Sequence, residues 1–175
     1  MEVTVDVPAT RGCIIGLLFI VAIAVTACDG PGGRAMRNTI TEQQAAQQVE
    51  ANVHAAVTQL PATARLEQEL THSTPCDDPT DSGPKGRVIA STSYQIHELS
   101  PAQYPHFFDL LRDWWQRNNY RVLDDSRLSA TDMYLWVENN QDGFRMALQS
   151  NDNGGLFITA SSPCVWPHGK PQPSP

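Results

Sequence analysis

Residues 133–160 read MYLWVENNQDGFRMALQSNDNGGLFITA, and this stretch decides the fold. Its apolar side chains alternate with other side chains in three short segments: Met133, Leu135 and Val137, then Phe144, Met146 and Leu148, then Leu156, Ile158 and Ala160. A period of two is typical of half-buried β-strands. Turn-forming residues 140–143, with Asp-Gly as the strongest signal, and 151–155 separate the segments. The stretch therefore predicts a three-stranded antiparallel meander.

Two further segments upstream are expected to be strands. Residues 87–98 alternate cleanly, with Val88, Ala90, Thr92, Tyr94 and Ile96 on one face. Residues 120–124 form a shorter candidate strand. Between residues 62 and 75 the pattern is ambiguous, although Leu66 and Leu70 suggest one or two helical turns. Residues 76–86 have the composition of a loop.

Two amphipathic helices accompany these strands. The first begins at a capping box formed by Thr39 with Glu42 or, in the alternative register, by Thr41 with Gln44. Its apolar face is expected to consist of Ala46, Val49, Val53, Val57 and Leu60, and Pro61 ends it. The second helix begins at residues 100–103, SPAQ, with Ser100 as N-cap and Gln103 closing the box, and it runs to about Asn118.

The second helix carries an unusually wide apolar stripe. Its core residues are expected to be Phe107, Leu110, Leu111 and Trp114, and Tyr104, Phe108 and Trp115 follow one margin. The stripe spans roughly 160° on a helical wheel, wider than the ~100° that a surface helix must bury. One hypothesis is that Tyr104, Phe108 and Trp115 line a groove that accepts an apolar ligand or partner segment. The alternative is that the first helix covers them through Val49, Val53 and Val57.

The element order is α-β-α-β-β-β-β. It predicts the α+β fold class, with an antiparallel sheet of about four to five strands and two helices packed on it. We expect one domain over residues 39–166, preceded by a flexible, Gly-rich tether at residues 28–38. Residues 167–175 are Pro-rich and are expected to form a disordered tail.

The N-terminal segment has the features of a targeting signal. Residues 13–27 read CIIGLLFIVAIAVTA, an uncharged run that is shorter than the ~20 residues of a membrane-spanning helix. The following Val25-Thr26-Ala27-Cys28 resembles the lipobox of bacterial lipoprotein signals. The resemblance implies cleavage after residue 27, diacylglycerol on Cys28, and anchoring to the extracytoplasmic face of the cell membrane. The alternatives are a plain signal peptide or a short anchor helix with a chance cysteine.

Two cysteines then remain for the exported domain, Cys76 and Cys164. An even pair in an oxidising compartment predicts a disulfide, and two separate buried thiols are the alternative. A C-x-x-C motif is absent from the sequence, so zinc-binding and thioredoxin-like interpretations have no support.

Composition and motifs exclude several function classes. The formal net charge of −7 argues against nucleic-acid binding and against docking on anionic lipid head groups. Ser82 and Lys85 fit S-x-x-K, but Pro84 forbids the helix that this motif requires. Asp77, Asp78 and Asp81 lack the glycine and glutamate of a calcium loop. The sequence contains no G-x-S-x-G and no H-E-x-x-H motif, and we expect no catalytic residue, metal or cofactor.

A family resemblance covers most of the mature chain. The lipobox, a TPC loop, a strand–helix unit with a tryptophan, the DGFRMAL strand and the SPCVWP ending are similar to small cell-envelope lipoproteins of actinobacteria, including mycobacteria. The residues that carry it are Cys28, Cys76, Trp114, Asp124, Gly143, Phe144, Ser162, Pro163, Cys164 and Pro167. The resemblance implies an envelope location and a Cys76–Cys164 bond, and it implies no activity.

Two function classes follow from the sequence. The first is a non-catalytic binding or structural module of the envelope, whose partner is a protein, lipid or glycan near the membrane. The second is a hydrolase-like envelope enzyme with a site that converges from distant segments. A deep pocket lined by two or more ionisable groups would favour the enzyme, and a flat or apolar groove would favour the binding module.

Overall fold

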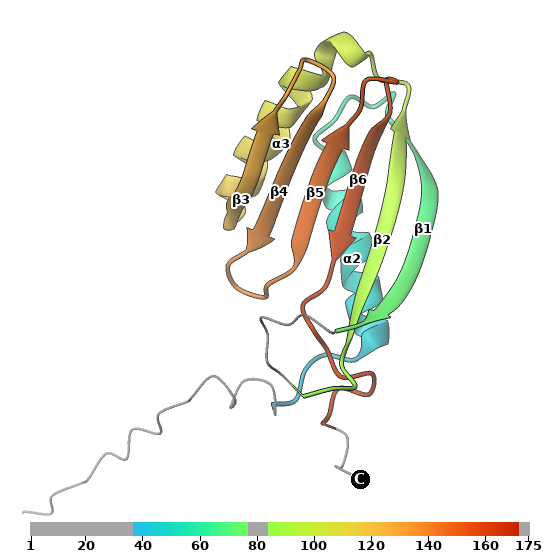
Figure 1. The fold of residues 1–175 in the computed structure, drawn as a ribbon, viewed down its shortest axis with the longest axis vertical. Helices are drawn as coiled ribbons and strands as arrows, with labels where there is room; N and C mark the ends of the chain where they lie inside the picture. Colours follow the sequence, from blue (N-terminus) through green and yellow to red (C-terminus); the bar gives the residue numbers. More distant parts are fainter. Residues whose placement is uncertain (1–36, 77–83, 172–175) are drawn as a thin grey trace, which may run out of the picture.

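A computed structural model of the chain describes residues 37–76 and 84–171. Figure 1 shows a single twisted sheet in front of two helices. The elements in chain order are α2 (Glu42–Val57), β1 (Arg65–Pro75), β2 (Val88–His97), the short 3₁₀ helix η1 (Pro101–Gln103), α3 (Tyr104–Arg117), β3 (Tyr120–Arg127), β4 (Met133–Asn139), β5 (Arg145–Ser150) and β6 (Leu156–Ser161).

The six strands form one antiparallel sheet in the order β1-β2-β6-β5-β4-β3. Helix α2 packs against β2 and β6, and α3 packs against β3 and β4. Both helices lie behind the same face of the sheet (Figure 1). The core lies between the helices and this face, and it includes the alternating apolar residues of β4, β5 and β6.

The predicted α+β class, the antiparallel sheet and the two helices are confirmed, but the number of strands is six rather than four to five. The difference is β1, where Leu66 and Leu70 suggested helical turns. Ten residue pairs join β1 to β2, with a bulge between Gln68 and Leu70. Pairing with the half-buried strand β2 determines the extended conformation of β1. Strand β1 itself is almost wholly exposed and has little alternation of apolar residues.

Helix α2 begins in the second of the two predicted registers. The backbone N–H of Gln44 donates to the Thr41 hydroxyl (3.2 Å), and the backbone N–H of Thr41 donates to Oε1 of the Gln44 side chain (2.9 Å). The buried face differs slightly from the prediction, because Ala45 and Ala56 are buried beside Val49 and Val53. Alanine fits where the helix lies close to the sheet.

The start of α3 is tighter than expected. Residues 101–103 form a 3₁₀ turn, and Ser100 makes no side-chain capping bond, so the predicted capping box with Gln103 is wrong. The physical reason is Pro105, which has no N–H to donate to the Pro101 carbonyl in an α-helical bond. The end of the helix is as predicted, and Asn119 adopts the left-handed conformation (φ 65°) that closes helices.

The proposed groove on α3 is not formed. Tyr104, Phe108 and Trp115 are at most 1% exposed and belong to the hydrophobic core. The sheet accounts for this, because α3 lies directly on β3 and β4 and buries the margin of its stripe. The Tyr104 hydroxyl also donates to the Gly154 carbonyl (2.7 Å), which ties α3 to the β5–β6 turn. These three side chains therefore offer no surface to a partner.

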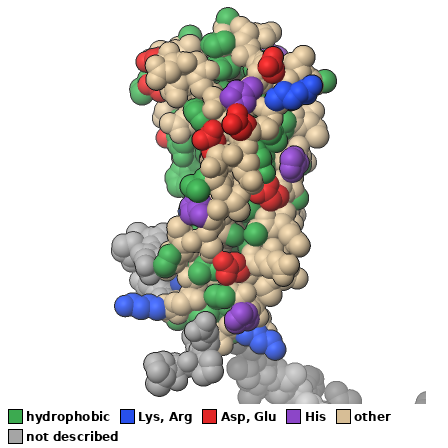
Figure 2. Space-filling view, turned by 90° about the vertical axis from the view of Figure 1, so that its right-hand side faces the viewer, with side chains coloured by type: hydrophobic (Ala, Val, Ile, Leu, Met, Phe, Trp, Pro, Cys, Tyr) green, Lys and Arg blue, Asp and Glu red, His purple; other side chains and the backbone are tan. Residues whose placement is uncertain are grey.

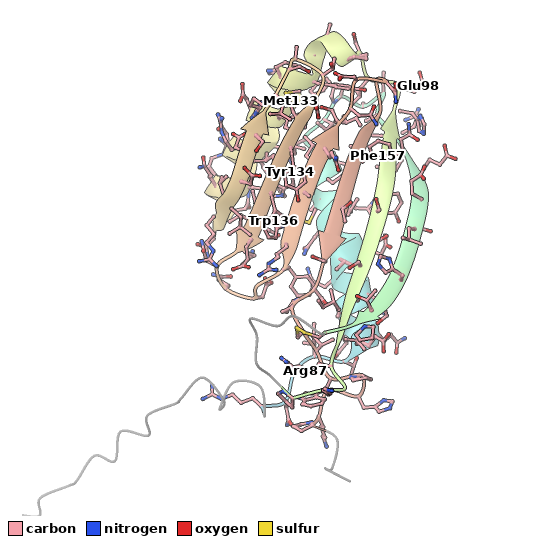
Figure 3. The ribbon with its side chains drawn as sticks, in the orientation of Figure 1. Arg87, Glu98, Met133, Tyr134, Trp136 and Phe157 are labelled. Atoms are coloured by element: carbon pink, nitrogen blue, oxygen red, sulfur yellow. A yellow bond between two sulfur atoms is a disulfide. The ribbon has the colours of Figure 1, made fainter. Side chains whose placement is uncertain are left out.

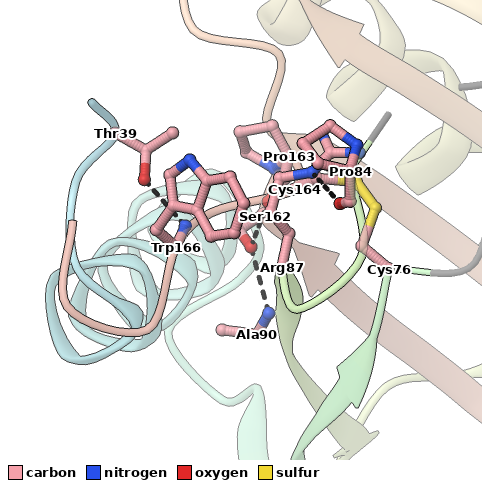
Figure 4. The surroundings of a disulfide bond; sticks show 9 residues. All are labelled: Thr39, Cys76, Pro84, Arg87, Ala90, Ser162, Pro163, Cys164 and Trp166. Carbon is pink, nitrogen blue, oxygen red and sulfur yellow. Dashed lines mark hydrogen bonds between the residues drawn. A yellow bond between two sulfur atoms is a disulfide. The ribbon is translucent and has the colours of Figure 1, made fainter. Parts of the chain in front are cut away.

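The disulfide joins the end of β1 to the C-terminal segment at one pole of the sheet. Cys76 and Cys164 are bonded, with their Cα atoms 5.8 Å apart, as the sequence predicted (Figure 4). Val88 and Val165 form a bridge beside the bond. The Ala90 amide donates to the Ser162 hydroxyl (3.0 Å), so residues 162–165 extend the sheet toward the disulfide.

Part of the expected disordered tail is ordered. Trp166, the last residue of the expected domain, is 2% exposed, and its backbone amide donates to the Thr39 hydroxyl (2.8 Å). The Thr39 amide donates to the Gly169 carbonyl (3.0 Å), and the Glu42 amide donates to the Pro167 carbonyl (3.2 Å). Proline content does not prevent order here, because carbonyl groups accept the otherwise unpaired amides at the start of α2.

The predicted leader, the predicted lipobox with Cys28, nearly all of the tether expected at residues 28–38, and the acidic residues 77–83 lie outside the described residues. Among the described helices, none is long and apolar enough to cross a membrane.

Candidate functional site on the open face of the sheet

The face of the sheet opposite the helices is uncovered within the described part of the chain. In Figure 3 this face points toward the viewer, and Tyr134, Trp136 and Phe157 lie on it. Each of the three side chains is partly exposed. We call these three residues the aromatic platform. Strand alternation produces it, because Met133, Leu135 and Val137 fill the opposite, buried face of β4.

Strand register places the platform residues in two neighbouring rows. Tyr134 pairs with Gln149, and Gln149 pairs with Phe157. The backbones of Tyr134 and Phe157 are therefore separated by two strand spacings, about 10 Å, and the exposed side chain of Gln149 lies between them. Trp136 lies two residues from Tyr134 on β4, about 7 Å along the strand. The arrangement can place flat apolar surfaces on both sides of a hydrogen-bonding group.

An ion-pair network holds one side of the platform. The guanidinium of Arg145 lies 5.3 Å from the centre of the Trp136 ring, and its Nε donates to Glu138 (2.7 Å). Arg121 donates to the other oxygen of Glu138. Burial raises the pKa of the Glu138 carboxyl, but hydrogen bonds from the two arginines outweigh burial and hold this pKa below its ordinary value. The network is therefore charged at neutral pH, and it fixes Arg145 over the indole.

A glycine positions the third ring. A Cβ atom at Gly155 would lie 2.7 Å from the Phe157 ring, which shows that the ring lies directly against the backbone of Gly155. Only glycine permits this approach without displacement of the ring. Phe157 is thereby held against the sheet instead of projecting from it.

The centre of the open face carries no formal charge. Beside Gln149 it presents Ala147, Thr159 and Ser93, and the Thr159 hydroxyl donates to the Ser93 hydroxyl (3.1 Å). The charged side chains of the same face lie toward its margins. Among them are Asp124 on β3, the Arg121–Glu138–Arg145 network, Arg65 on β1, and Glu67 of β1, which pairs with His97 of β2 (2.9 Å). The open face thus combines aromatic rings, amides and hydroxyls with a neutral centre.

A second polar cluster joins α2 to β1. The Tyr94 hydroxyl donates to Glu50, and the Gln68 amide donates to both the Tyr94 hydroxyl (3.0 Å) and Glu50 (3.3 Å). Burial and the neighbouring Glu50 raise the pKa of Tyr94, which keeps the phenol protonated as a donor. The cluster holds the edge strand β1 against helix α2. Figure 2 shows this side of the molecule, with carboxylates and imidazoles scattered among polar and apolar atoms.

One depression of about 490 Å³ lies at the disulfide pole, beside the start of α2. It is shallow and open, and its ionisable residues are Glu42 and His168. Across residues 37–76 and 84–171, no group of three or more acidic, histidine or cysteine side chains is arranged to hold a metal ion. The depression therefore lacks the enclosed convergence of ionisable groups that an active site needs.

The structure places the sequence-predicted site residues in three different situations. Cys28 lies outside the described residues, Cys76 and Cys164 form a structural bond, and Tyr104, Phe108 and Trp115 are core residues. Alternation in the sequence puts Tyr134 and Trp136 on the strand face opposite Met133, Leu135 and Val137, but the sequence analysis did not identify them as a site. The available signal was two aromatic residues on a strand face that is ordinarily polar.

Comparison with known proteins gives no relative: no protein-family model, no curated protein and no solved structure matches this chain.

Proposed function

We propose that this chain is a lipid-anchored, non-catalytic binding module of the bacterial cell envelope, and that the open face of its sheet binds the partner. The observation that carries the proposal is the aromatic platform: Tyr134, Trp136 and Phe157 are the aromatic residues of strands β4–β6, and all three remain partly exposed. Partly exposed aromatic clusters commonly mark contact sites.

The proposed anchor is compatible with this use of the sheet. Cys28 of the lipobox precedes the first described residue, Arg37, by nine positions, so the tether spans at most roughly 30 Å. The segment 37–41 joins the C-terminal segment at the disulfide pole. This pole is the lower end of the domain in Figure 1, and the sheet extends upward from it. A lipid on Cys28 would hold the lower end near the membrane and leave the open face accessible from the side.

No observation on the described residues favours the alternative of a hydrolase. The depression at the disulfide pole is open and shallow, and Glu42 and His168 make no hydrogen bond with each other among the described contacts. The open face has rings and neutral polar groups at its centre instead of a nucleophile with a base beside it.

Site-specific photocrosslinking in intact cells tests the proposed face. We expect a benzophenone side chain at position 149 to give a discrete crosslinked product, because Gln149 lies exposed between the platform rings. The matched control is the same probe at position 47, since Gln47 is also an exposed glutamine and lies on α2. The yields are compared by immunoblot.

Equal products from positions 149 and 47, or no product from position 149, would refute the open face as the binding surface. A product from position 149 that disappears when Trp136 is replaced by alanine would support it, because the replacement removes a platform ring without touching the probe.

A further inference from the structure

We infer that the ligand of the open face is a neutral, hydroxyl-rich glycan chain. This inference rests on the proposed function and adds to it the chemical class of the partner. Its basis is the combination of three partly exposed rings with a charge-free centre of amide and hydroxyl groups, all on one uncovered sheet face.

The chemistry of a sugar ring matches this combination. One face of a pyranose presents C–H groups that pack on an aromatic ring, while its rim presents hydroxyls that both donate and accept hydrogen bonds. Tyr134 and Phe157 supply rings on either side of Gln149, whose amide can donate and accept. Thr159 and Ser93 add hydroxyls in the next row. The two strands that carry these rings lie about 10 Å apart, a span that suits a chain of several sugars better than a single one.

Charge argues for a neutral ligand. The Arg121–Glu138–Arg145 network places two guanidinium groups on one carboxylate at one end of the face. Asp124 lies beyond Trp136 on the edge strand, and Glu67 is paired with His97 on the opposite edge. A strongly anionic or cationic ligand would therefore find no matching field over the neutral centre, and it would lose hydration there without compensation.

The polar residues of the open face also disfavour a lipid chain or a second copy of this chain as its ligand. Gln149 and Thr159 interrupt the apolar surface between the rings, so a lipid chain would bury unpaired polar groups. A second copy packed face to face would desolvate two copies of the Arg–Glu network and of Gln149. The rings are also held in place before binding, Phe157 by Gly155 and Trp136 by Arg145, which lowers the ordering cost of binding an extended chain.

Direct binding measurements test the inference. The full mature chain is purified from membranes in a detergent without a sugar headgroup, and titrated with hexasaccharides of β-1,4-linked N-acetylglucosamine, β-1,4-linked glucose and α-1,4-linked glucose. We expect at least one of them to bind. Trp136→Ala should weaken that binding about tenfold or more. Leu128→Ser, at an exposed apolar residue outside the sheet, should leave it unchanged.

A second variant removes any dependence on the folding of Trp136→Ala. Gln149 is exposed, so Gln149→Glu changes only the charge of the centre, and it should weaken binding while the melting temperature is retained. Failure of all three hexasaccharides to bind, or undiminished binding by both variants, would overturn the inference. If position 149 crosslinks to a protein or to a second copy while no sugar binds, the glycan is refuted and the open face is retained as the binding surface. If position 149 gives no crosslink and no sugar binds, both the glycan and the binding surface are refuted.

Discussion

Replacing Cys76 and Cys164 together with serine is expected to lower the free energy of unfolding by about 4–5 kcal/mol, the chain-entropy value for a loop of this length. The two residues are 88 positions apart in the sequence, so the bond removes much of the freedom of the unfolded chain. It also fixes the C-terminal segment that supplies hydrogen bonds to Thr39 and to the start of α2. Figure 4 shows the hydrogen bond from Trp166 to Thr39 together with the disulfide.

Thermal and urea unfolding of the two forms would measure this loss. Reductant should lower the melting temperature of the unmodified protein and leave that of the double-serine variant unchanged. A tryptic map without reductant should show the Cys76 and Cys164 peptides joined. Free alkylation of both thiols in exported protein, or a loss below about 1 kcal/mol in the variant, would contradict the structural role assigned to the bond.

Trp115→Ala is expected to cost about 3–5 kcal/mol of stability, the usual range for deletion of a core tryptophan. Trp115 is fully buried among the α3 and sheet side chains, so alanine would leave a large cavity. The ring nitrogen of Trp115 has no hydrogen-bond partner among the described residues. The loss therefore comes from packing and not from a broken hydrogen bond.

Trp114 is the matched control for this experiment. It lies on the same helix but is only partly buried, so Trp114→Ala should cost clearly less. Urea unfolding of the two variants gives the comparison, and crosslinking from position 149 reports on binding. An unchanged stability in Trp115→Ala, together with a loss of crosslinked product, would restore the contact role that the width of the helical stripe first suggested.

The sequence predicted most of the elements because their patterns were local. Alternation identified the strands from Met133 to Ala160, and the Asp-Gly turn placed a glycine where the backbone has a φ of 75°. For α2 the sequence predicted two possible registers of the capping box but could not select one. The selection depends on contacts with residues 166–169, which come from the far end of the chain.

The errors have a common physical origin in tertiary contacts. Strand β1 forms because β2 offers an unpaired edge. The side chains of β1 are mostly exposed, so its sequence shows little of the alternation that would predict a strand. The margin of α3 is buried because the sheet is wide enough to cover it, which the helical wheel alone does not reveal. The candidate site was missed for a related reason: the rows that join Tyr134 to Phe157 through Gln149 depend on the register of three strands.

The most direct test of the central claim, a membrane-anchored binding module, is the mass of the N-terminal peptide of the mature protein isolated from cell membranes. The lipobox predicts a peptide that begins at Cys28 and carries diacylglycerol in thioether linkage. The Cys28→Ala variant should yield no lipidated peptide and should accumulate with its leader attached. A mature chain that begins at another residue, or one that begins at Cys28 with a free thiol, would contradict the lipid anchor and with it the proposed position of the open face beside the membrane.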